Sequence, residues 1–416
     1  MKNKIESAIV LGLALGFPAV AAAGPKTPIA EDLASNPGDW CEWLQSKPGT
    51  LYKNKENPYI QEFQIEGRFQ YQYGHVDGND LNGVDYDEDY DEARRVRLGV
   101  KAKFLQYFGL KYQVNMALDT RPSLPNGELD WGYFDMDEAY LTFDLAKAFG
   151  NTGFDKLSLV YGRQKFLFGT ESHTSSTKLY TIERSALANK VYGSYRPTGL
   201  TLKGERGAWQ FAASAYSSSR DGLLNKELNG WQDSYSVLFN LAYQASDELL
   251  LRGDFTYNDA ERGEDTIMAY KWALAFGAEY DADSWGVNAD FIYGDNGDAS
   301  NIVVPDRRGN FYGFQVTPWM WLVEDKLQLV GQYQYQGSDN DAGIRINSRY
   351  GRRLTGPGIS NAGGRGDSHH SVYAGLNYYL CGHNTKIQAG LEYQTLDAAR
   401  GDFDTLTYLL AFRMYF

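Results

Sequence analysis

The chain has 416 residues, of which 43% are hydrophobic and 15% aromatic, and its formal net charge at pH 7 is −13. This acidic balance argues against a nucleic-acid-binding protein, which normally concentrates Lys and Arg on one face. Two cysteines and five histidines exclude a multi-cysteine metal cluster, so we expect no metal site and no cofactor. The 31 Tyr and 44 Gly instead favour a β-rich fold.

The first 23 residues have the pattern of a secretory signal peptide. Lys2 and Lys4 form a charged start, an apolar stretch covers 8–22, and small residues precede Gly24. A transmembrane anchor is the alternative, which the shortness of the stretch and an internal proline disfavour. Cleavage after residue 23 predicts an exported protein with a periplasmic leader over 24–58, in which the cysteines can be oxidised.

From residue 59 onward, segments of about ten residues alternate between apolar and polar side chains. In one of them, Val96 and Leu98 fall on one face while Arg95 and Arg97 fall on the other. Apolar positions that recur every second residue indicate strands, whereas a helix repeats every third or fourth. The expected strands are 60–75, 92–106, 108–118, 134–146, 156–164, 187–203, 207–217, 232–244, 247–258, 267–280, 284–294, 309–321, 326–336, 368–380, 385–396 and 403–416.

The connections between these segments alternate between tight turns, such as 245–246, and long polar loops, such as 119–133 and 337–367. An outer-membrane barrel has this arrangement because its short turns face the periplasm and its long loops face outside. A sheet in lipid must pair every backbone group internally, so it closes on itself. The sequence therefore predicts an all-β fold, a transmembrane antiparallel β-barrel of about 16 strands over 59–416. A soluble β-sandwich is the alternative, and the regular alternation of connections disfavours it.

Several motifs resemble the phosphate-selective porin O and P family. The stretch RRVRLGVKAK at 94–103 resembles the second strand of that family, and the resemblance extends over 60–416. The remaining matches are YGRQK at 161–165, FG at 168–169, TSS at 174–176 and IERS at 182–185. The resemblance implies a trimeric barrel of sixteen strands, with a loop near 165–186 that folds into the channel. It also implies an anion path lined by arginines and lysines.

Basic side chains lie on the polar face of the first expected strands and around this loop. If the polar face is the lumen, they form a wall that attracts anions. The alternative is that they pair with lumen carboxylates such as Glu66 and Asp144 and keep the wall rigid. The candidate pore-lining residues are Arg68, Arg95, Arg97, Lys101, Lys103, Lys111, Arg163, Lys165, Lys178 and Arg184.

The two cysteines are expected to lie on the same side of the membrane. Cys41 precedes the first strand, and Cys381 lies in an expected periplasmic turn. A disulfide between them would tether the 24–58 leader beneath the pore. Two separately placed thiols are the alternative.

The expected function is passive diffusion of small hydrophilic solutes through a porin of the bacterial outer membrane, with phosphate-like anions favoured. The expected partners are outer-membrane lipid, lipopolysaccharide, small solutes or inorganic anions, and two further copies in a homotrimer. A general non-selective porin, or a structural or adhesion barrel with ligand-binding external loops, is the alternative. No nucleophile-and-base arrangement points to an enzyme. The expected first external loop, 77–92, carries eight carboxylates, which would repel anions at the mouth and form a solvated rim that binds divalent cations.

Overall fold

In the computed structural model, the chain divides into two units, Met1–Trp40 and Cys41–Phe416. The structure describes residues 40–79, 83–117, 131–192, 196–217, 235–259, 268, 270–297, 308–346, 350, 364–399 and 401–416. The expected signal peptide, 1–23, and the leader as far as residue 39 lie outside these ranges. None of the helices in the described ranges has both the length and the apolar character needed to cross a membrane.

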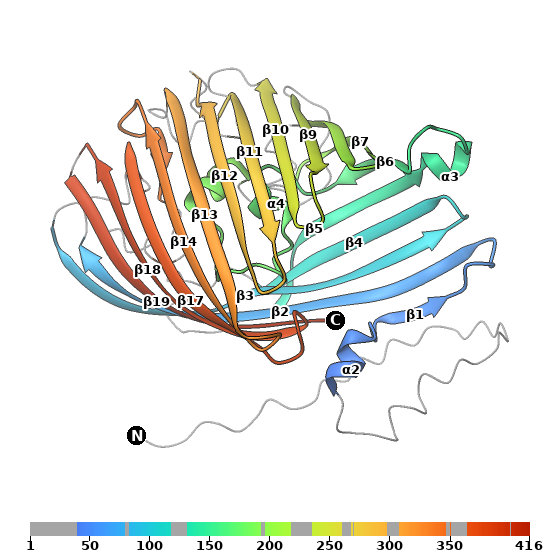
Figure 1. Ribbon diagram of the computed structural model, residues 1–416, viewed down its shortest axis with the longest axis horizontal. Coiled ribbons are helices and arrows are strands. Elements are labelled where there is room, and N and C mark those ends of the chain that lie inside the picture. Colours follow the sequence, from blue (N-terminus) through green and yellow to red (C-terminus); the bar gives the residue numbers. More distant parts are fainter. Residues whose placement is uncertain are drawn as a thin grey trace. The chain divides into compact units, whose positions relative to one another are not determined.

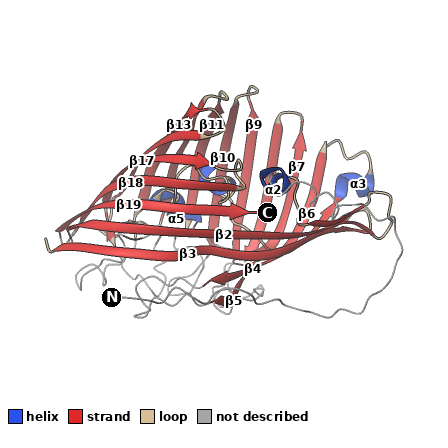
Figure 2. Cartoon of the chain, turned by 90° about the horizontal axis from the view of Figure 1, so that it is seen from below, coloured by secondary structure: helices blue, strands red, loops and turns tan. Residues whose placement is uncertain are grey.

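Sixteen antiparallel strands form a closed barrel (Figure 1). Each strand pairs with its neighbour along the chain, and β19 (Gly401–Tyr415) returns to pair with β2 (Ile60–Asn79) and complete the ring (Figure 2). The others are β3 (Asp85–Phe104), β4 (Phe108–Ala117), β5 (Trp131–Asp144), β6 (Lys156–Arg163), β7 (Thr198–Arg206), β8 (Trp209–Ser217), β9 (Tyr235–Gln244), β10 (Leu249–Asp259), β11 (Trp272–Asp281), β12 (Trp285–Asp295), β13 (Asn310–Val323), β14 (Leu327–Ser338), β17 (Ser368–Tyr379) and β18 (Thr385–Ala398). The predicted fold class is confirmed. A separate two-stranded ladder joins β15 (Ile344–Arg345) to β16 (Arg365–Gly366).

Side chains alternate between the two faces of the barrel wall. In β18, Ile387 and Leu391 are exposed on the outer face, whereas Lys386 and Gln388 are buried on the inner face. In a soluble protein, apolar side chains face inward and polar side chains face outward. A barrel in lipid requires the opposite arrangement, because its outer face contacts hydrocarbon and its lumen contacts water. Polar groups that point inward are therefore available to line a channel or to hold a loop inside it.

The expected strand 187–203 is wrong in its first part. The structure has the helix α5 (Ala186–Tyr192) there, and β7 starts only at Thr198. The sequence of α5, ALANKVY, is rich in good helix formers, and six of its seven residues are buried. A helix that is buried around most of its surface lacks a clear polar face, so its period is hard to distinguish from that of a buried strand.

The expected first external loop, 77–92, is also mostly strand. β2 and β3 are 20 residues long each, and Asp77 pairs in register with Asp87. Cross-strand hydrogen bonds hold the carboxylates, since the Tyr71 hydroxyl donates to Asp91 at 2.5 Å and the Tyr73 hydroxyl donates to Asp89. The acidic segment is therefore the end of a long hairpin instead of a loop, and its Asp87 and Asp89 side chains remain exposed.

The described part of the expected leader is attached to the end of the barrel at which β2 begins. β1 (Thr50–Lys53) pairs with the start of β2, along the edge that β19 leaves open because it ends at Tyr415. The short helix α2 (Trp40–Gln45) carries Cys41, which forms a disulfide with Cys381 across a Cα–Cα distance of 5.1 Å. The disulfide and β1 together fix residues 41–53 to the barrel.

The last residue closes the barrel over a glycine. The Gly67 amide donates to the Phe416 carbonyl at 3.2 Å, and the Phe416 amide donates to the Gly67 carbonyl at 3.1 Å. A Cβ at Gly67 would overlap the Phe416 ring. Only glycine leaves room for the terminal aromatic ring at this point of the β2–β19 seam.

Gly67→Ala is therefore expected to lower the free energy of unfolding by about 1–3 kcal/mol, the usual cost of overpacking. Urea unfolding of protein folded into lipid vesicles measures the change. Gly253→Ala is the matched control, because a Cβ there meets nothing within 4 Å. Equal stability of the two variants would contradict the packing argument.

Candidate channel constriction

The connection between β6 and β7 is called here the constriction loop, and its described residues, 164–192 and 196–197, bond to side chains on the inner face of the barrel. It contains α4 (Thr170–His173) and α5, and side chains from the inner faces of many strands hold it. The expected inward loop, 165–186, lies within this connection. Its position depends on three groups of contacts, which are described in chain order.

Two carboxylates hold the start of the loop. The Gly169 amide donates to Asp254 of β10 at 2.8 Å. The Thr170 amide and hydroxyl both donate to Asp290 of β12, at 2.9 and 2.5 Å. All four residues are buried, so these hydrogen bonds satisfy groups that would otherwise be costly to remove from water. The start of α4 is therefore fixed to the wall of β10 and β12.

Two buried cations hold the middle of the loop through its backbone carbonyls. Lys386 Nζ donates to the Leu179 carbonyl at 2.6 Å, and Arg413 Nη2 donates to the Ile182 carbonyl at 2.7 Å. The sequence interpretation did not select Lys386 or Arg413, although both lie on the polar face of the last two strands. Alternation could have placed them in the lumen, but their partners lie more than 200 residues away.

An ion pair holds the second half of the loop. Arg94 Nε lies 2.6 Å from Glu183 Oε1, and Arg94 Nη2 lies 3.1 Å from Glu183 Oε2. Arg94 is the extra residue of a β-bulge, because Arg95 pairs with Gln70 while Ala93 pairs with the next residue of β2. The bulge lets Arg94 and Arg95 both reach the interior. Strict alternation assigns Arg94 to the lipid face, so the sequence interpretation left it out.

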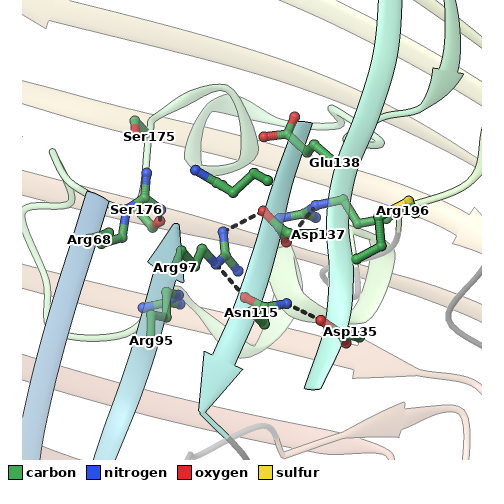
Figure 3. Close-up of polar contacts among 12 residues, drawn as sticks. Arg68, Arg95, Arg97, Asn115, Asp135, Asp137, Glu138, Ser175, Ser176 and Arg196 are labelled. Carbon is green, nitrogen blue, oxygen red and sulfur yellow. Dashed lines mark hydrogen bonds and ion pairs between the residues drawn. The ribbon is translucent and has the colours of Figure 1, made fainter. Parts of the chain in front are cut away.

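Beside the loop, Asp137 of β5 receives two arginines. Arg97 Nη1 lies 2.7 Å from Asp137 Oδ2, and Arg196 Nε lies 3.2 Å from Asp137 Oδ1. Figure 3 shows Arg97 between Asp137 and Asn115, whose amide oxygen accepts from Arg97 Nε at 2.7 Å. Arg196 lies at the end of the constriction loop. The sequence did not identify it as a lumen residue, because the expected strand 187–203 included this position.

Two lysines on the same wall pair with glutamates. Lys111 Nζ lies 2.7 Å from Glu138 and 3.4 Å from Glu66, and Lys101 also pairs with Glu66. Pairing with Glu66 was one of the interpretations left open by the sequence. Asp144, the other expected partner, instead caps α3 (Leu145–Phe149) by accepting from the Lys147 amide at 2.9 Å. That expectation is wrong because the strand ends at Asp144 and a helix begins there.

Two cations of this wall have no carboxylate within ion-pair distance in the described ranges. Arg68 Nη1 donates to the Ser176 hydroxyl at 2.5 Å, and Arg68 lies opposite Arg97 in the strand register. Burial lowers the pKa of Lys165 to about 8, and the nearby Glu138 partly opposes this shift. The cation cluster and its carboxylates are Arg68, Arg97, Lys101, Lys111, Lys165 and Arg196 with Glu66, Asp137 and Glu138. The cluster thus has six cations and three carboxylates, and four of the cations pair with these carboxylates.

The other predicted pore-lining residues have different places. Lys103 pairs with Glu62 at 2.6 Å near the start of β2, and Lys178 is exposed on the constriction loop. The rest bond to neutral groups near the loop: Arg95 to the Gln70 amide oxygen, Arg163 to the Met136 carbonyl and Arg184 to the carbonyls of Glu171 and Thr174, all at 2.7–2.8 Å. Arg184 therefore stabilises the fold of the constriction loop itself.

A closed barrel that is apolar outside, polar inside and narrowed by an inward loop defines a porin-type channel protein. The chain belongs to the phosphate-selective porin O and P family, whose sequence profile matches residues 63–297. Porin O of Pseudomonas aeruginosa is 31% identical over 179 residues, which are 43% of this chain. The match spans 34% of the length of that relative. The family prediction is confirmed.

Solved barrels share this fold at low sequence identity. The outer membrane channel DcaP of Acinetobacter baumannii is 14% identical with a TM-score of 0.56, covering 88% of this chain and all of its own. OmpT of Vibrio cholerae is 11% identical with a TM-score of 0.54, covering 88% and 99%. An anion-selective porin from Comamonas acidovorans is 10% identical with a TM-score of 0.54, covering 85% and 99%. These similarities concern the fold alone.

Proposed function

We propose that the protein is an outer-membrane porin through which small hydrophilic solutes diffuse, with anions favoured and phosphate-like anions among them. One observation carries this proposal: the cluster beside the constriction loop has six cations against three carboxylates. Excess positive charge in a narrow lumen with low-dielectric walls raises the local concentration of anions. The name of the family and the similar fold of the anion-selective porin from Comamonas acidovorans agree with a preference for anions.

Arg68 and Arg97 are the strongest candidates to contact a passing anion. They lie directly opposite each other on β2 and β3, where two like charges repel. Arg68 Nε is buried without a hydrogen-bond partner in the described ranges, so one of its donors is unused. An oxyanion between the two guanidiniums would neutralise the repulsion and accept charge-assisted hydrogen bonds.

The acidic hairpin end weakens this preference less than the sequence indicates. Asp89 and Asp91 bond to Tyr73 and Tyr71, and Tyr73 is exposed on the outer face. On the inner face of the same strand, Gln72 and Val76 are buried and uncharged. Part of the acidic charge therefore faces away from the lumen, where lipopolysaccharide and its divalent cations are the partners we propose.

Export and assembly complete the proposal. The signal peptide pattern of 1–23 supports delivery to the bacterial outer membrane through a cleaved leader. A similar barrel, OmpT of Vibrio cholerae, was solved in a trimer form, and we propose a homotrimer for this chain as well. Crosslinking of protein extracted in mild detergent measures the number of copies.

The proposal is tested by the reversal potential of purified protein in a planar bilayer under a KCl gradient. We expect an anion-selective potential and a chloride current that added phosphate blocks. Arg68→Gln is expected to weaken both, whereas the matched control Lys103→Gln changes a side chain that is 68% exposed at the mouth and leaves both unchanged. A cation-selective potential would contradict the anion preference, and the absence of any channel would overturn the porin function.

A further inference from the structure

Aromatic rings form a continuous row on another part of the inner wall. Tyr180 of the constriction loop stacks on Trp319, with centroids 5.3 Å apart and planes 12° apart. Trp321 lies 6.4 Å from Trp319 and 5.0 Å from Tyr379, and His383 lies 5.2 Å from Tyr379. These five residues are called the aromatic row. It leads from the constriction loop to the periplasmic turn after β17.

The aromatic row is not part of the girdle that contacts lipid. Along β13 the inner positions Gln315 and Thr317 are buried, while the outer residue Met320 is 47% exposed. Trp319 and Trp321 continue the inner series, and Trp319 is only 5% exposed. Lipid anchoring therefore does not explain why large rings occupy these positions.

The row ends in a cleft of about 410 Å³ at the periplasmic end of the barrel. Gln45, Trp321, Asp325, Lys326, Tyr379 and His383 line it, together with the Cys41–Cys381 disulfide. The size is within the range of small-molecule sites, which combine aromatic surface with a few polar groups that fix orientation. This cleft has both kinds of group.

The polar groups of the cleft suit hydroxyls and an anionic group. His383 Nδ1 is buried and has no hydrogen-bond partner in the described part of the chain. Burial lowers the pKa of His383 to about 3, so its ring is neutral at pH 7 and has one donor and one acceptor nitrogen. Lys326 lines the cleft, and the charges of Lys178 and Lys386 act on His383 from nearby. Asp325 is the acidic side chain in the lining.

We propose that this cleft binds a solute that carries both a sugar ring and an anionic group, of which a hexose phosphate is the simplest example. The apolar C–H face of the sugar packs on the indole ring of Trp321. Tryptophan suits this contact because its ring face is apolar while its N–H can still form a hydrogen bond. Gln45, Asp325 and His383 bond to the hydroxyls, and Lys326 with Lys178 attracts the phosphate. The inference rests on the proposed function, because the cation cluster favours the same charge.

Calorimetric titration of the purified full-length protein in detergent tests the proposal, with glucose 6-phosphate, glucose and inorganic phosphate as separate probes. Glucose 6-phosphate is expected to bind most tightly of the three. Trp321→Ala is expected to weaken its binding about five- to tenfold, the scale of one lost aromatic contact. Trp321→Phe keeps a ring and is expected to stay near the parent protein. Trp285→Ala is the matched control, because Trp285 is 48% exposed on the outer face.

The unfavourable outcomes are distinct from failure of the porin function. Unchanged binding in Trp321→Ala, or an equal loss for glucose 6-phosphate and phosphate, would show that the ring is not recognised. If glucose bound as tightly as glucose 6-phosphate, the proposal that the solute carries an anionic group would be overturned. These titrations need no conductance, so they can fail while the reversal potential stays anion-selective, or succeed while it does not. Heat-dependent gel mobility of each variant confirms that its barrel is folded.

Discussion

The preference for anions is expected to fall as the pH rises from 7 to 9, because Lys165 loses its charge in that range. Burial lowers the pKa of Lys165 to about 8. About nine-tenths of this residue is then protonated at pH 7 and about one-tenth at pH 9. Guanidinium groups do not normally lose their proton in this range. The reversal potential under a fixed KCl gradient should therefore move toward cation selectivity with a midpoint near pH 8.

Two variants of Lys165 separate its contribution from that of other groups. The Lys165→Arg protein should keep the pH 7 potential across the whole range, since a guanidinium does not titrate there. The Lys165→Gln protein should show the weaker anion preference at every pH. If Lys165→Arg still loses selectivity with a midpoint near pH 8, another group titrates in the lumen and the prediction is wrong.

The barrel could be predicted because lipid imposes one simple rule on every strand. A period of two is visible without knowing the partner strand, so the polar face of β2, β3 and β4 correctly placed Arg68, Arg97 and Lys111 on the same side. The buried helix α5 could not be predicted in the same way, because its surroundings inside the barrel remove the polar face that a helix normally shows.

The pairing within the constriction could not be predicted for a different reason. A bulge shifts the alternation at Arg94, and the strand sequence contains no signal that fixes where an extra residue is inserted. The partners of Asp137 come from β3 and from the end of the constriction loop, so they depend on how the loop enters the barrel. Sequence alternation gives the face of a side chain, whereas three-dimensional structure decides which charges neutralise one another.

The second large effect is expected at the start of the constriction loop, where Asp290→Ala removes its fixation to β12. Three donors lose their acceptor, namely the Thr170 amide, the Thr170 hydroxyl and the Gln315 side-chain amide. Because these groups are buried, the free energy of unfolding is expected to fall by about 3 kcal/mol. Urea unfolding in lipid vesicles measures this change, and Asp247→Ala in an exposed turn is the matched control.

The same variant should change the channel without removing its selectivity. The loop loses its contact with β12, while the Gly169–Asp254 bond and the Arg94–Glu183 pair remain. The cations of the cluster that lie on β2 to β4, namely Arg68, Arg97, Lys101 and Lys111, keep their places. Single-channel recordings are therefore expected to show higher and noisier conductance at a reversal potential that stays anion-selective. Glu183→Gln should have the opposite effect and change the reversal potential. It leaves Arg94 partly buried without its countercharge, which disturbs the wall of the channel itself. A steady conductance in Asp290→Ala would show that the remaining contacts, from Asp254, Arg94, Lys386 and Arg413, are enough to fix the loop.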